Sequence, residues 1–342
     1  MKHFILSTLM AVMTTLGVGF TSVAQAAPCA TPTTTLKIAT LAPDGTSLFK
    51  GLQAVKNGIK AKTEGCVDVQ LYAGGSAGDE KDVVRKMRIG QLSGAALTGV
   101  GLGMIEPEIR VLELPFLFKQ AQGPTNYTQI DNVYGQMKPY FEQKFDEKGF
   151  KLLGWAEVGY VQIFTRDKPI KTRADMGGMK MWMWEGDPLA QAMYEALKVV
   201  PVPLAVTDVL TSLQTGLIDG CYAPPLGALA FQWHTKSKFV TKVDLVNGTG
   251  GLILAKAAWD SLGAQQAAVK EVIASEAQKL TAQSRTDNAQ SMQVLATAGL
   301  QIVELDPAAK TELQGISTEV AQKLVGKLYP QALLDKILAL TK

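Results

Sequence analysis

The sequence predicts a mixed α/β protein with two lobes, and three observations lead to this fold class. Short apolar strands alternate with amphipathic helices along most of the chain, which is the pattern of α/β proteins. About 316 residues follow a predicted leader, whereas single hydrophobic cores stop growing at about 250 to 300 residues. The segment from Ala264 to about Ala296 contains no Gly or Pro, so we expect one long helix that braces both lobes.

Residues 1–26 have the three parts of a secretory signal peptide. Lys2 precedes an apolar run over residues 4–20, and small residues at Ala24 and Ala26 form a cleavage site. The alternative is a membrane anchor, but the run is shorter than about 18 residues, contains several Thr and Ser, and is joined by no second apolar span. We therefore expect an exported protein that is cleaved after Ala26 and is not embedded in the membrane.

The charge of the chain favours neither nucleic acid nor membranes as a partner. Lys and Arg number 34 against 31 Asp and Glu, a net charge of +3, and removal of the leader takes away only Lys2. Proteins that bind polyanions carry a strong basic excess or a basic patch. This nearly balanced composition is that of an ordinary globular protein.

The first predicted elements are a strand, a helix and a second strand. The strand covers Leu36 to Thr40, and the next strand covers Val67 to Tyr72. Between them, apolar residues recur at helical spacing until Gly65 ends the helix. These residues are Leu48, Leu52, Val55 and Ile59.

A weak internal repeat also favours two lobes. After the glycine-rich turn 74–78, a helix from Asp79 to Arg88 begins with two acidic residues at its positive end. Gly90 closes this helix and a short strand follows Gly94; Gly216 and Gly220 have the same positions after a later helix. Glycine is suited to such helix ends because it adopts positive φ easily. Any αβ connection can have this pattern, so the repeat alone leaves the number of lobes open.

The mature chain has three cysteines, and export places them where disulfides persist. Cys29 precedes the first strand and Cys66 immediately precedes the second, so neighbouring strands bring the two together. We expect this bridge. Cys221 is left over and is expected to be a small buried residue rather than a nucleophile.

Few side chains are suited to catalysis or cofactor binding. His234 is the single histidine after the leader, which excludes His-rich metal sites and leaves any catalytic triad dependent on one residue. The glycines of 99–103 and 248–251 do not match the spacing of dinucleotide or phosphate loops. We expect no cofactor and no metal.

Three motifs of the sequence resemble those of a known protein family. The chain resembles the periplasmic solute-binding subunits of tripartite ATP-independent periplasmic (TRAP) transporters, the dicarboxylate-receptor (DctP-like) family, over nearly the whole mature sequence. The motifs are Lys168-Pro169-Ile170, Ala174-Asp175-Met176-Gly177-Gly178-Met179-Lys180, and Leu213-Gln214-Thr215-Gly216 with Ile218-Asp219-Gly220. The first strand, the glycine-rich turn and the segment from Glu113 to Phe118 match as well.

The resemblance implies the fold and the activity of a transport receptor. Two lobes joined by hinge strands, the periplasmic binding protein fold, close over a ligand in the periplasm and deliver it to TRAP membrane permease subunits, without catalysis. The implied first lobe comprises residues 27–157 and about 247–285. The second comprises residues 158–246 and about 286–342.

The departures from the family concern the ligand. In most members an arginine that clamps the ligand carboxylate ends the Gly-hydrophobic-Lys motif, and this chain has Trp182 there. A second family arginine falls near Val161 or Gln162, and a family asparagine falls near Ala223. A tryptophan offers a large apolar face with one N–H donor. Trp182 and Trp184 alternate on a strand, so both are expected on one side.

The candidate ligand-binding residues come from both walls of the predicted cleft and from a lobe crossing, where strands end and loops emerge. They are Asp44, Gly78, Glu80, Thr98, Glu157, Gln162, Trp182, Trp184, Gln214, Tyr222, Ala223 and Pro224.

Two hypotheses of different classes follow. The first is a TRAP receptor for a more hydrophobic acid or a neutral molecule; a small organic acid stays possible if Lys81, Arg85 or Arg166 supplies the missing charge. The second is a secreted α/β hydrolase that uses Cys221 or a serine, with His234 or a carboxylate as base. An exported structural protein is disfavoured because aromatic and glycine-rich loops converge on the predicted cleft.

Overall fold

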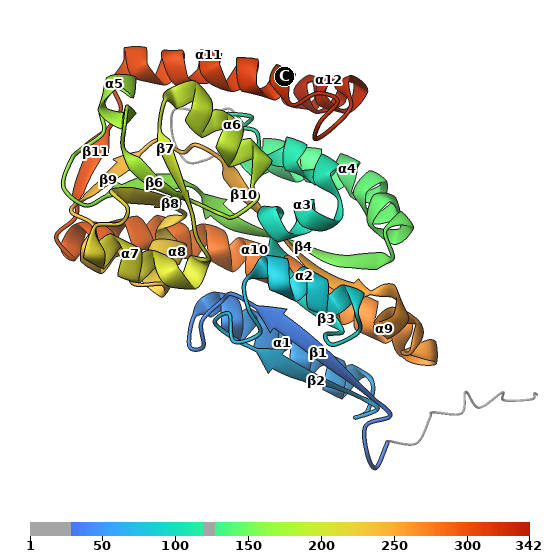
Figure 1. The fold of residues 1–342 in the computed structure, drawn as a ribbon. Coiled ribbons are helices and arrows are strands. Elements are labelled where there is room, and N and C mark those ends of the chain that lie inside the picture. Colours follow the sequence, from blue (N-terminus) through green and yellow to red (C-terminus); the bar gives the residue numbers. More distant parts are fainter. Residues whose placement is uncertain (1–28, 119–126) are drawn as a thin grey trace, which may run out of the picture.

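The computed structural model describes residues 29–118 and 127–342. The predicted signal peptide, residues 1–26, lies outside these described residues. Two β-sheets build two lobes with helices packed around them (Figure 1). The predicted α/β fold with two lobes is therefore confirmed.

The first lobe contains, within the described residues, a sheet of five strands in the order β2-β1-β3-β10-β4. β1 runs parallel to β2 and β3, and β10 runs antiparallel to β3 and β4. The strands are β1 (Thr34–Thr40), β2 (Val67–Tyr72), β3 (Gly94–Thr98), β4 (Phe150–Tyr160) and β10 (Asn247–Ala255). The helices of this part are α1 (Ser47–Lys62), α2 (Glu80–Arg88), α3 (Gly99–Ile105), η1 (Pro107–Glu113), α4 (Tyr127–Glu147), α9 (Lys256–Asp260) and η4 (Gly263–Gln265).

The second lobe contains, again among the described residues, a sheet of six strands in the order β11-β9-β5-β8-β6-β7. The strands are β5 (Gln162–Thr165), β6 (Lys180–Met183), β7 (Val200–Pro203), β8 (Gly220–Ala223), β9 (Phe239–Lys242) and β11 (Gln301–Glu304). The helices are α5 (Arg173–Met176), α6 (Pro188–Leu197), η2 (Val206–Asp208), α7 (Val209–Thr215), α8 (Pro225–Ala230), η3 (Trp233–Lys236) and α11 (Pro307–Lys323).

Local sequence signals set the ends of the first helix. Thr46 caps α1 by accepting a hydrogen bond from the backbone N–H of Phe49 at 3.2 Å. Gly65 follows the helix with φ of 81° and donates its N–H to the carbonyl of Lys60 at 2.8 Å. The buried face begins at Phe49 rather than at Leu48, which is only half-buried, and it continues through the other three residues predicted for it.

Two strands cross between the lobes and pair with each other where they cross. β4 continues into β5 through Val161, and β9 leads into β10 through residues 243–246. The N–H of Val161 donates to the carbonyl of Val246 at 2.8 Å, and the N–H of Leu245 donates to the carbonyl of Val161 at 2.9 Å. These hydrogen-bonded crossings are the hinge strands of the predicted fold.

A long helix, α10 (Gln266–Thr297), braces the molecule as predicted from residues 264–296. It packs against α1 and β4 of the first lobe and against α8 of the second, and Figure 1 shows it running past both sheets. The final helix, α12 (Gln331–Leu340), packs against α4 and η1. The expected lobe boundaries stay predictions.

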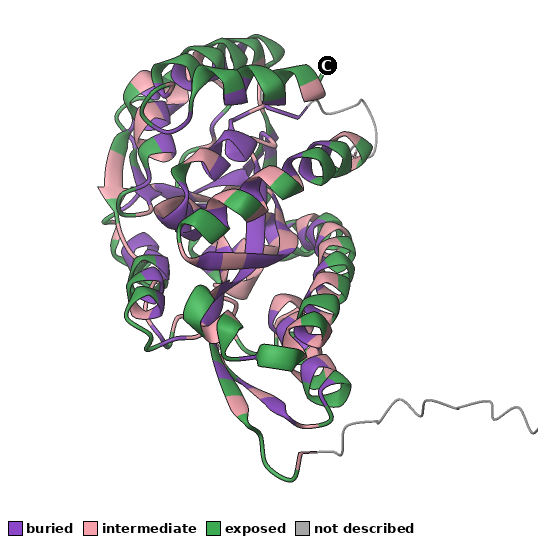
Figure 2. Cartoon of the chain, turned by 90° about the vertical axis from the view of Figure 1, so that its right-hand side faces the viewer, coloured by how far each residue is buried: buried purple, intermediate pink, exposed green. Residues whose placement is uncertain are grey.

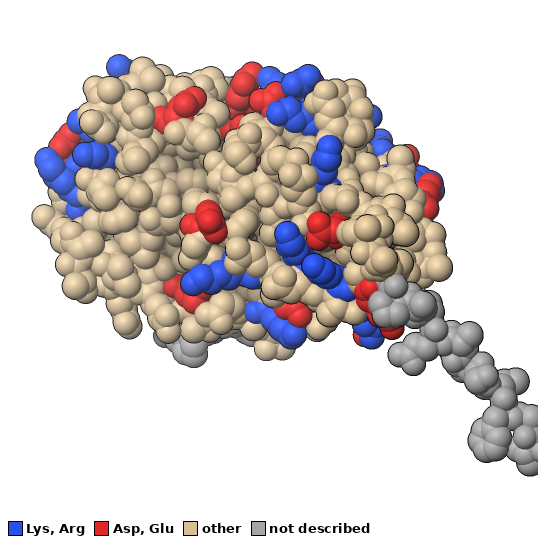
Figure 3. All heavy atoms as spheres, turned by 90° about the horizontal axis from the view of Figure 1, so that it is seen from below, with Lys and Arg blue, Asp and Glu red and all other residues tan. Residues whose placement is uncertain are grey.

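The burial of residues follows the arrangement of sheets and surrounding helices. Buried residues concentrate in the sheets and on the inner faces of the helices, and exposed residues cover the outer helix faces (Figure 2). On the face seen in Figure 3, basic and acidic side chains are interspersed. Among the described residues, no helix combines the length and apolar character needed to cross a membrane.

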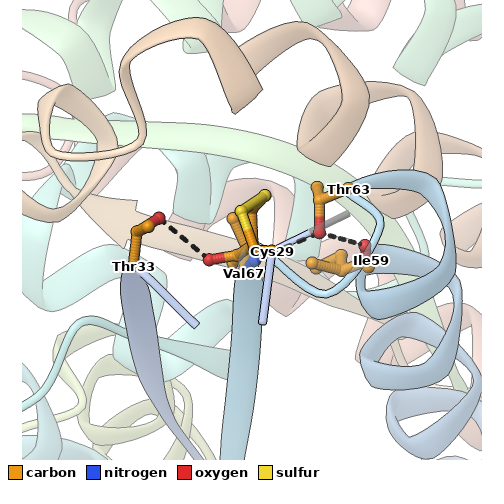
Figure 4. The surroundings of a disulfide bond; sticks show 6 residues. Cys29, Thr33, Ile59, Thr63 and Val67 are labelled. Carbon is orange, nitrogen blue, oxygen red and sulfur yellow. Dashed lines mark hydrogen bonds between the residues drawn. A yellow bond between two sulfur atoms is a disulfide. The ribbon is translucent and has the colours of Figure 1, made fainter. Parts of the chain in front are cut away.

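A disulfide joins Cys29 to Cys66, the pair expected from the sequence, with 5.0 Å between their Cα atoms (Figure 4). Neighbouring hydrogen bonds fix its surroundings. The Thr33 hydroxyl donates to the carbonyl of Cys66 at 3.1 Å, and the Thr63 hydroxyl donates to the carbonyl of Ile59 at 2.8 Å. The bridge thereby ties the segment before β1 to the start of β2.

Candidate functional site

A cavity of about 260 Å³ lies between the two lobes. From the first lobe it is lined by the ends of β1 and β3, the start of α2, η1 and the glycine-rich strand β10. From the second it is lined by β6, the start of α6, β8 and the loop that leads to η3. The cavity extends behind the first sheet to α1 and α10. Carboxyl ends of strands thus face the cavity from both sheets, the usual position of ligands in open α/β folds.

Stacked aromatic rings form the wall on the second lobe. Trp182 lies 4.9 Å from Tyr222 in a stacked arrangement, 4.9 Å from Trp184, and 5.1 Å from Trp233 edge to face, all between ring centroids. Phe231 stacks on Trp233 at 5.3 Å. Such aromatic pairs are rigid and contribute about 0.5 to 1.5 kcal/mol each beyond the area that they bury.

Trp182 has no polar group left for a ligand. Its side chain is 1% exposed, and its indole N–H donates to the carbonyl of Leu204 at 3.0 Å. Tyr194 fixes the backbone beside it by donating its hydroxyl to the Trp182 carbonyl at 2.8 Å. The cavity therefore has an apolar surface at Trp182, the residue that the resemblance places at the family's arginine position.

Glu80, at the start of α2, is a buried acid on the opposite wall. One carboxylate oxygen accepts the N–H of Thr98 at 2.6 Å, and the other accepts the Thr98 hydroxyl and the N–H of Gly101, both at 2.7 Å. Burial raises the pKa of Glu80 to about 7, against the opposing effect of these hydrogen bonds. A Cβ atom at Gly101 would lie 2.7 Å from Glu80 Oε2, so this approach requires glycine.

Arg110, on η1, is held between two acids that are buried with it. Its Nη2 donates to both oxygens of Asp187, at 3.1 and 3.0 Å, and its Nη1 lies 3.0 Å from Glu113 Oε2. Burial alone would lower the pKa of Arg110, but the carboxylates of Asp187 and Glu113 raise it, so the guanidinium stays charged. Burial raises the pKa of Glu113, and Arg110 opposes that effect.

The same region closes the cavity, because one short segment of the second lobe contacts the first lobe three times. Trp184 donates its indole N–H to Asp79 Oδ1 at 3.1 Å, Glu185 pairs with Lys81 at 2.6 Å, and Asp187 binds Arg110. We name residues 184–187 the clasp. It holds the two lobes in a closed arrangement around the cavity.

Glu157, on β4, lines the cavity near the lobe crossing, and a neighbouring cation neutralises its charge. Arg285 of α10 donates to both of its carboxylate oxygens, with 3.1 Å between Nε and Oε2. The same guanidinium also binds Asp131 of α4 and lies over the ring of Tyr127, 4.1 Å from its centroid. Burial raises the pKa of Glu157, and Arg285 opposes that effect.

Most of the residues expected to bind a ligand lie at the cavity wall. Those that line it are Glu80, Thr98, Glu157, Trp182, Trp184, Tyr222, Ala223 and Pro224. Their contact with a ligand stays a prediction.

Four expected residues lie outside the cavity lining. Asp44 is exposed and accepts the N–H of Gly45 at 2.8 Å, and Gly78 serves the turn before α2 with φ of 101°. The Gln162 side chain is used by the hinge, where it accepts the N–H groups of residues 243 and 244 at 2.9 and 3.0 Å. Gln214 is exposed on α7. These four residues serve turns or the hinge, or face solvent.

Sequence reasoning missed Arg110, which is the only lysine or arginine among the described residues that line the cavity. The cations considered instead lie elsewhere: Lys81 and Arg85 are in exposed ion pairs, and Arg166 packs beside Gly216. The sequence around Arg110 carries no signal of burial, because Glu106, Glu108 and Glu113 lie in the same short segment before the Leu-Pro-Phe motif. Charged residues are almost never fully buried unless they are paired, so such a segment is typical of a solvated surface.

The hydrolase hypothesis finds no support in this geometry. Cys221 is completely buried in β8, and burial raises the pKa of its thiol, which keeps it protonated. Nδ1 of His234 lies 3.2 Å from the carbonyl oxygen of Ala228, a structural contact.

Comparison with known proteins assigns the chain to a family. The sequence model of bacterial extracellular solute-binding proteins, family 7, matches residues 38–327. A solute-binding protein of Chromohalobacter salexigens is 27% identical over 277 residues, which cover 80% of this chain and 81% of that protein. The C4-dicarboxylate-binding periplasmic protein DctP of Rhodobacter capsulatus is 24% identical over 293 residues, with 84% and 85% covered.

Solved structures agree on the fold. The sugar acid binding protein of Advenella mimigardefordensis, in complex with galactonate, superposes with a TM-score of 0.84 at 18% identity, covering 91% of this chain and 98% of that one. These similar proteins are transport receptors and not enzymes, so the resemblance stated from the sequence is confirmed.

Proposed function

From the premise that this chain belongs to the bacterial extracellular solute-binding proteins of family 7, and is a TRAP-type receptor for a small ligand, we propose that its ligand has a largely apolar body and needs no carboxylate. The observation that carries the proposal is the geometry of Trp182, whose N–H is bound to Leu204 and whose ring is stacked on Tyr222. The resemblance implies that this residue takes the position of the family's arginine. The ligand is a more hydrophobic acid held by its tail or a neutral molecule.

The receptor acts by closing. The hinge strands and α10 join the lobes, and the clasp contacts complete the cavity only when the lobes meet. A ligand that contacts both walls stabilises this closed state relative to the open one. We propose that the closed receptor works in the periplasm and delivers its ligand to TRAP membrane permease subunits, as the family membership supports.

Native mass spectrometry of the purified mature protein tests the ligand class. The complex is then denatured, and any molecule that purified with it is identified, in parallel for wild type and Trp182→Arg. We expect an apolar molecule in wild type and its loss in Trp182→Arg, because a cation then replaces the stacked ring.

Trp259→Arg is the matched control, since Trp259 is half-buried on α9 and does not line the cavity. This control is expected to retain the ligand. A small hydrophilic acid bound to the wild type, such as succinate or a sugar acid, would overturn the proposed ligand class and leave the receptor role in place.

A further inference from the structure

We propose that Asp187 determines ligand specificity: its carboxylate occupies Arg110 in the place that a ligand carboxylate would take, and so excludes acids from this end of the cavity. The inference rests on the proposed function, because it explains how a receptor of this family holds a ligand without a carboxylate. Asp187 and Arg110 come from opposite lobes and both line the cavity.

The local backbone holds Asp187 in this position. Gly186, with φ of 78°, turns the chain after β6, and Asp187 then caps α6. Its Oδ1 accepts the N–H groups of Leu189 at 3.0 Å and Ala190 at 3.2 Å. The carboxylate is thus fixed by the helix N-terminus before the lobes close, with both oxygens directed to Arg110 Nη2.

The charge balance around Arg110 disfavours a further anion. One guanidinium lies between the carboxylates of Asp187 and Glu113, and all three side chains are less than one-tenth exposed. The cluster therefore carries a net negative charge when both acids are ionised. A ligand carboxylate beside it would add like charge in a site with little solvent screening, which is costly. Glu80 is a further buried acid on the wall that the first lobe contributes to the cavity.

A neutral oxygen meets no such repulsion. Arg110 Nε is buried and has no hydrogen-bond partner among the described residues, so it is not presented to a ligand in the closed cavity. An amide, carbonyl or hydroxyl head brings no charge to the acidic cluster, whereas a carboxylate does. The charge balance therefore favours a neutral polar head on an apolar body over an acid.

Octanoate and octanamide form a matched pair of probes, since they share one tail and differ in the charge of the head. Their dissociation constants are measured by calorimetry on ligand-stripped wild type and Asp187→Asn. Asparagine keeps the cap of α6 but removes the charge. We expect wild type to prefer octanamide, and Asp187→Asn to bind octanoate about tenfold or more tightly than wild type does.

Two further variants make the result specific. Glu185→Gln removes a neighbouring clasp acid that is exposed and does not line the cavity, and it is expected to leave the preference unchanged. Adding Arg110→Gln to Asp187→Asn is expected to abolish the gain for octanoate, because the freed guanidinium is its cause.

The proposal is overturned if folded Asp187→Asn binds octanoate no better than wild type does, or if the gain survives Arg110→Gln. If Asp187→Asn fails to fold, Asp187→Ser, which also caps helices, replaces it under the same criteria. A preference of wild type for octanoate over octanamide would overturn the proposal as well. Failure of the proposed function looks different, because wild type would then bind a hydrophilic acid such as glucuronate in preference to both probes.

Discussion

Asp79 of one lobe accepts the indole N–H of Trp184 of the other, with 3.1 Å between Oδ1 and Nε1. Its second oxygen accepts the N–H of Val206, also from the second lobe, at 2.8 Å. The same side chain caps α2 through the N–H of Glu80. One carboxylate therefore fixes the start of a cavity-lining helix and joins it to the aromatic wall.

We predict that Asp79→Ala destabilises the closed state. The variant loses two hydrogen bonds between the lobes and one cap, and bonds to a charged acceptor contribute about 1.5 to 3 kcal/mol each. The open state should gain at least tenfold in population relative to wild type. Small-angle X-ray scattering of ligand-stripped protein should show a larger radius of gyration.

Asp82→Ala is the control for this experiment, because Asp82 lies on the same helix and, within the part of the chain that the structure describes, pairs with exposed Arg85 alone. Equal radii of gyration for wild type and Asp79→Ala would mean that these bonds do not hold the lobes together.

Cys221 should be unreactive in the folded protein. Its side chain is completely buried, and burial raises the pKa of its thiol, so neither access nor thiolate is available to a reagent. Titration with dithionitrobenzoate should give no thiol in native protein and one thiol in unfolded, unreduced protein, because Cys29 and Cys66 are bridged. Rapid labelling of native protein would contradict this prediction and favour the hydrolase hypothesis. In a binding assay, Cys221→Ala should leave octanamide binding unchanged.

Much of the fold was predictable because local signals define it. The long helix was expected over residues 264–296 and forms over Gln266–Thr297, since no Gly or Pro interrupts it. Gly90 and Gly216 both follow helices with positive φ, and strands begin at Gly94 and Gly220, as the repeat predicts. The elements against which α12 packs were not predictable, because its apolar residues mark a buried face but not the elements that cover it.

The aromatic half of the site was predictable and the charged half was not. The alternation of Trp182 with Trp184 placed both rings on one side, and both line the cavity. The bond between Arg110 and Asp187 spans 77 residues and two lobes, and neither periodicity nor spacing encodes such a contact. Folding alone brings the two charges together. The sequence also contains no sign that Leu204 uses the indole N–H of Trp182.

Reduction of the disulfide should lower thermal stability without abolishing the fold. The bridge closes a loop between residues 37 apart, and the chain-entropy model assigns such a loop up to about 4 kcal/mol. The melting temperature of wild type should fall in dithiothreitol, whereas Cys29→Ser/Cys66→Ser should melt lower and be insensitive to the reductant. An unchanged melting temperature in wild type whose thiols titrate as reduced would show that the bridge adds no stability.

Glu80 should make the protein less stable as the pH rises from about 4.5 to about 7. Burial raises the pKa of Glu80 from 4.5 to about 7 in the folded state, so between these values the folded protein holds a proton that the unfolded chain releases. Its contribution is most favourable below pH 4.5, declines as the pH approaches 7 and is constant above, a change on the order of 3 kcal/mol. Urea unfolding of wild type and Glu80→Gln between pH 4.5 and 8 measures it.

The test compares how the free energies of unfolding of wild type and Glu80→Gln change with pH, rather than their absolute values. Glutamine cannot accept all three hydrogen bonds that Glu80 receives, so Glu80→Gln is expected to be less stable at pH 5. Because glutamine does not titrate, the deficit relative to wild type should shrink as the pH rises to 7. Glu195→Gln, which removes an exposed carboxylate on α6, is the control for the loss of one acid. A deficit that stays constant over this range would show that Glu80 is already ionised in the folded protein at pH 5, with its three hydrogen bonds outweighing the cost of burial.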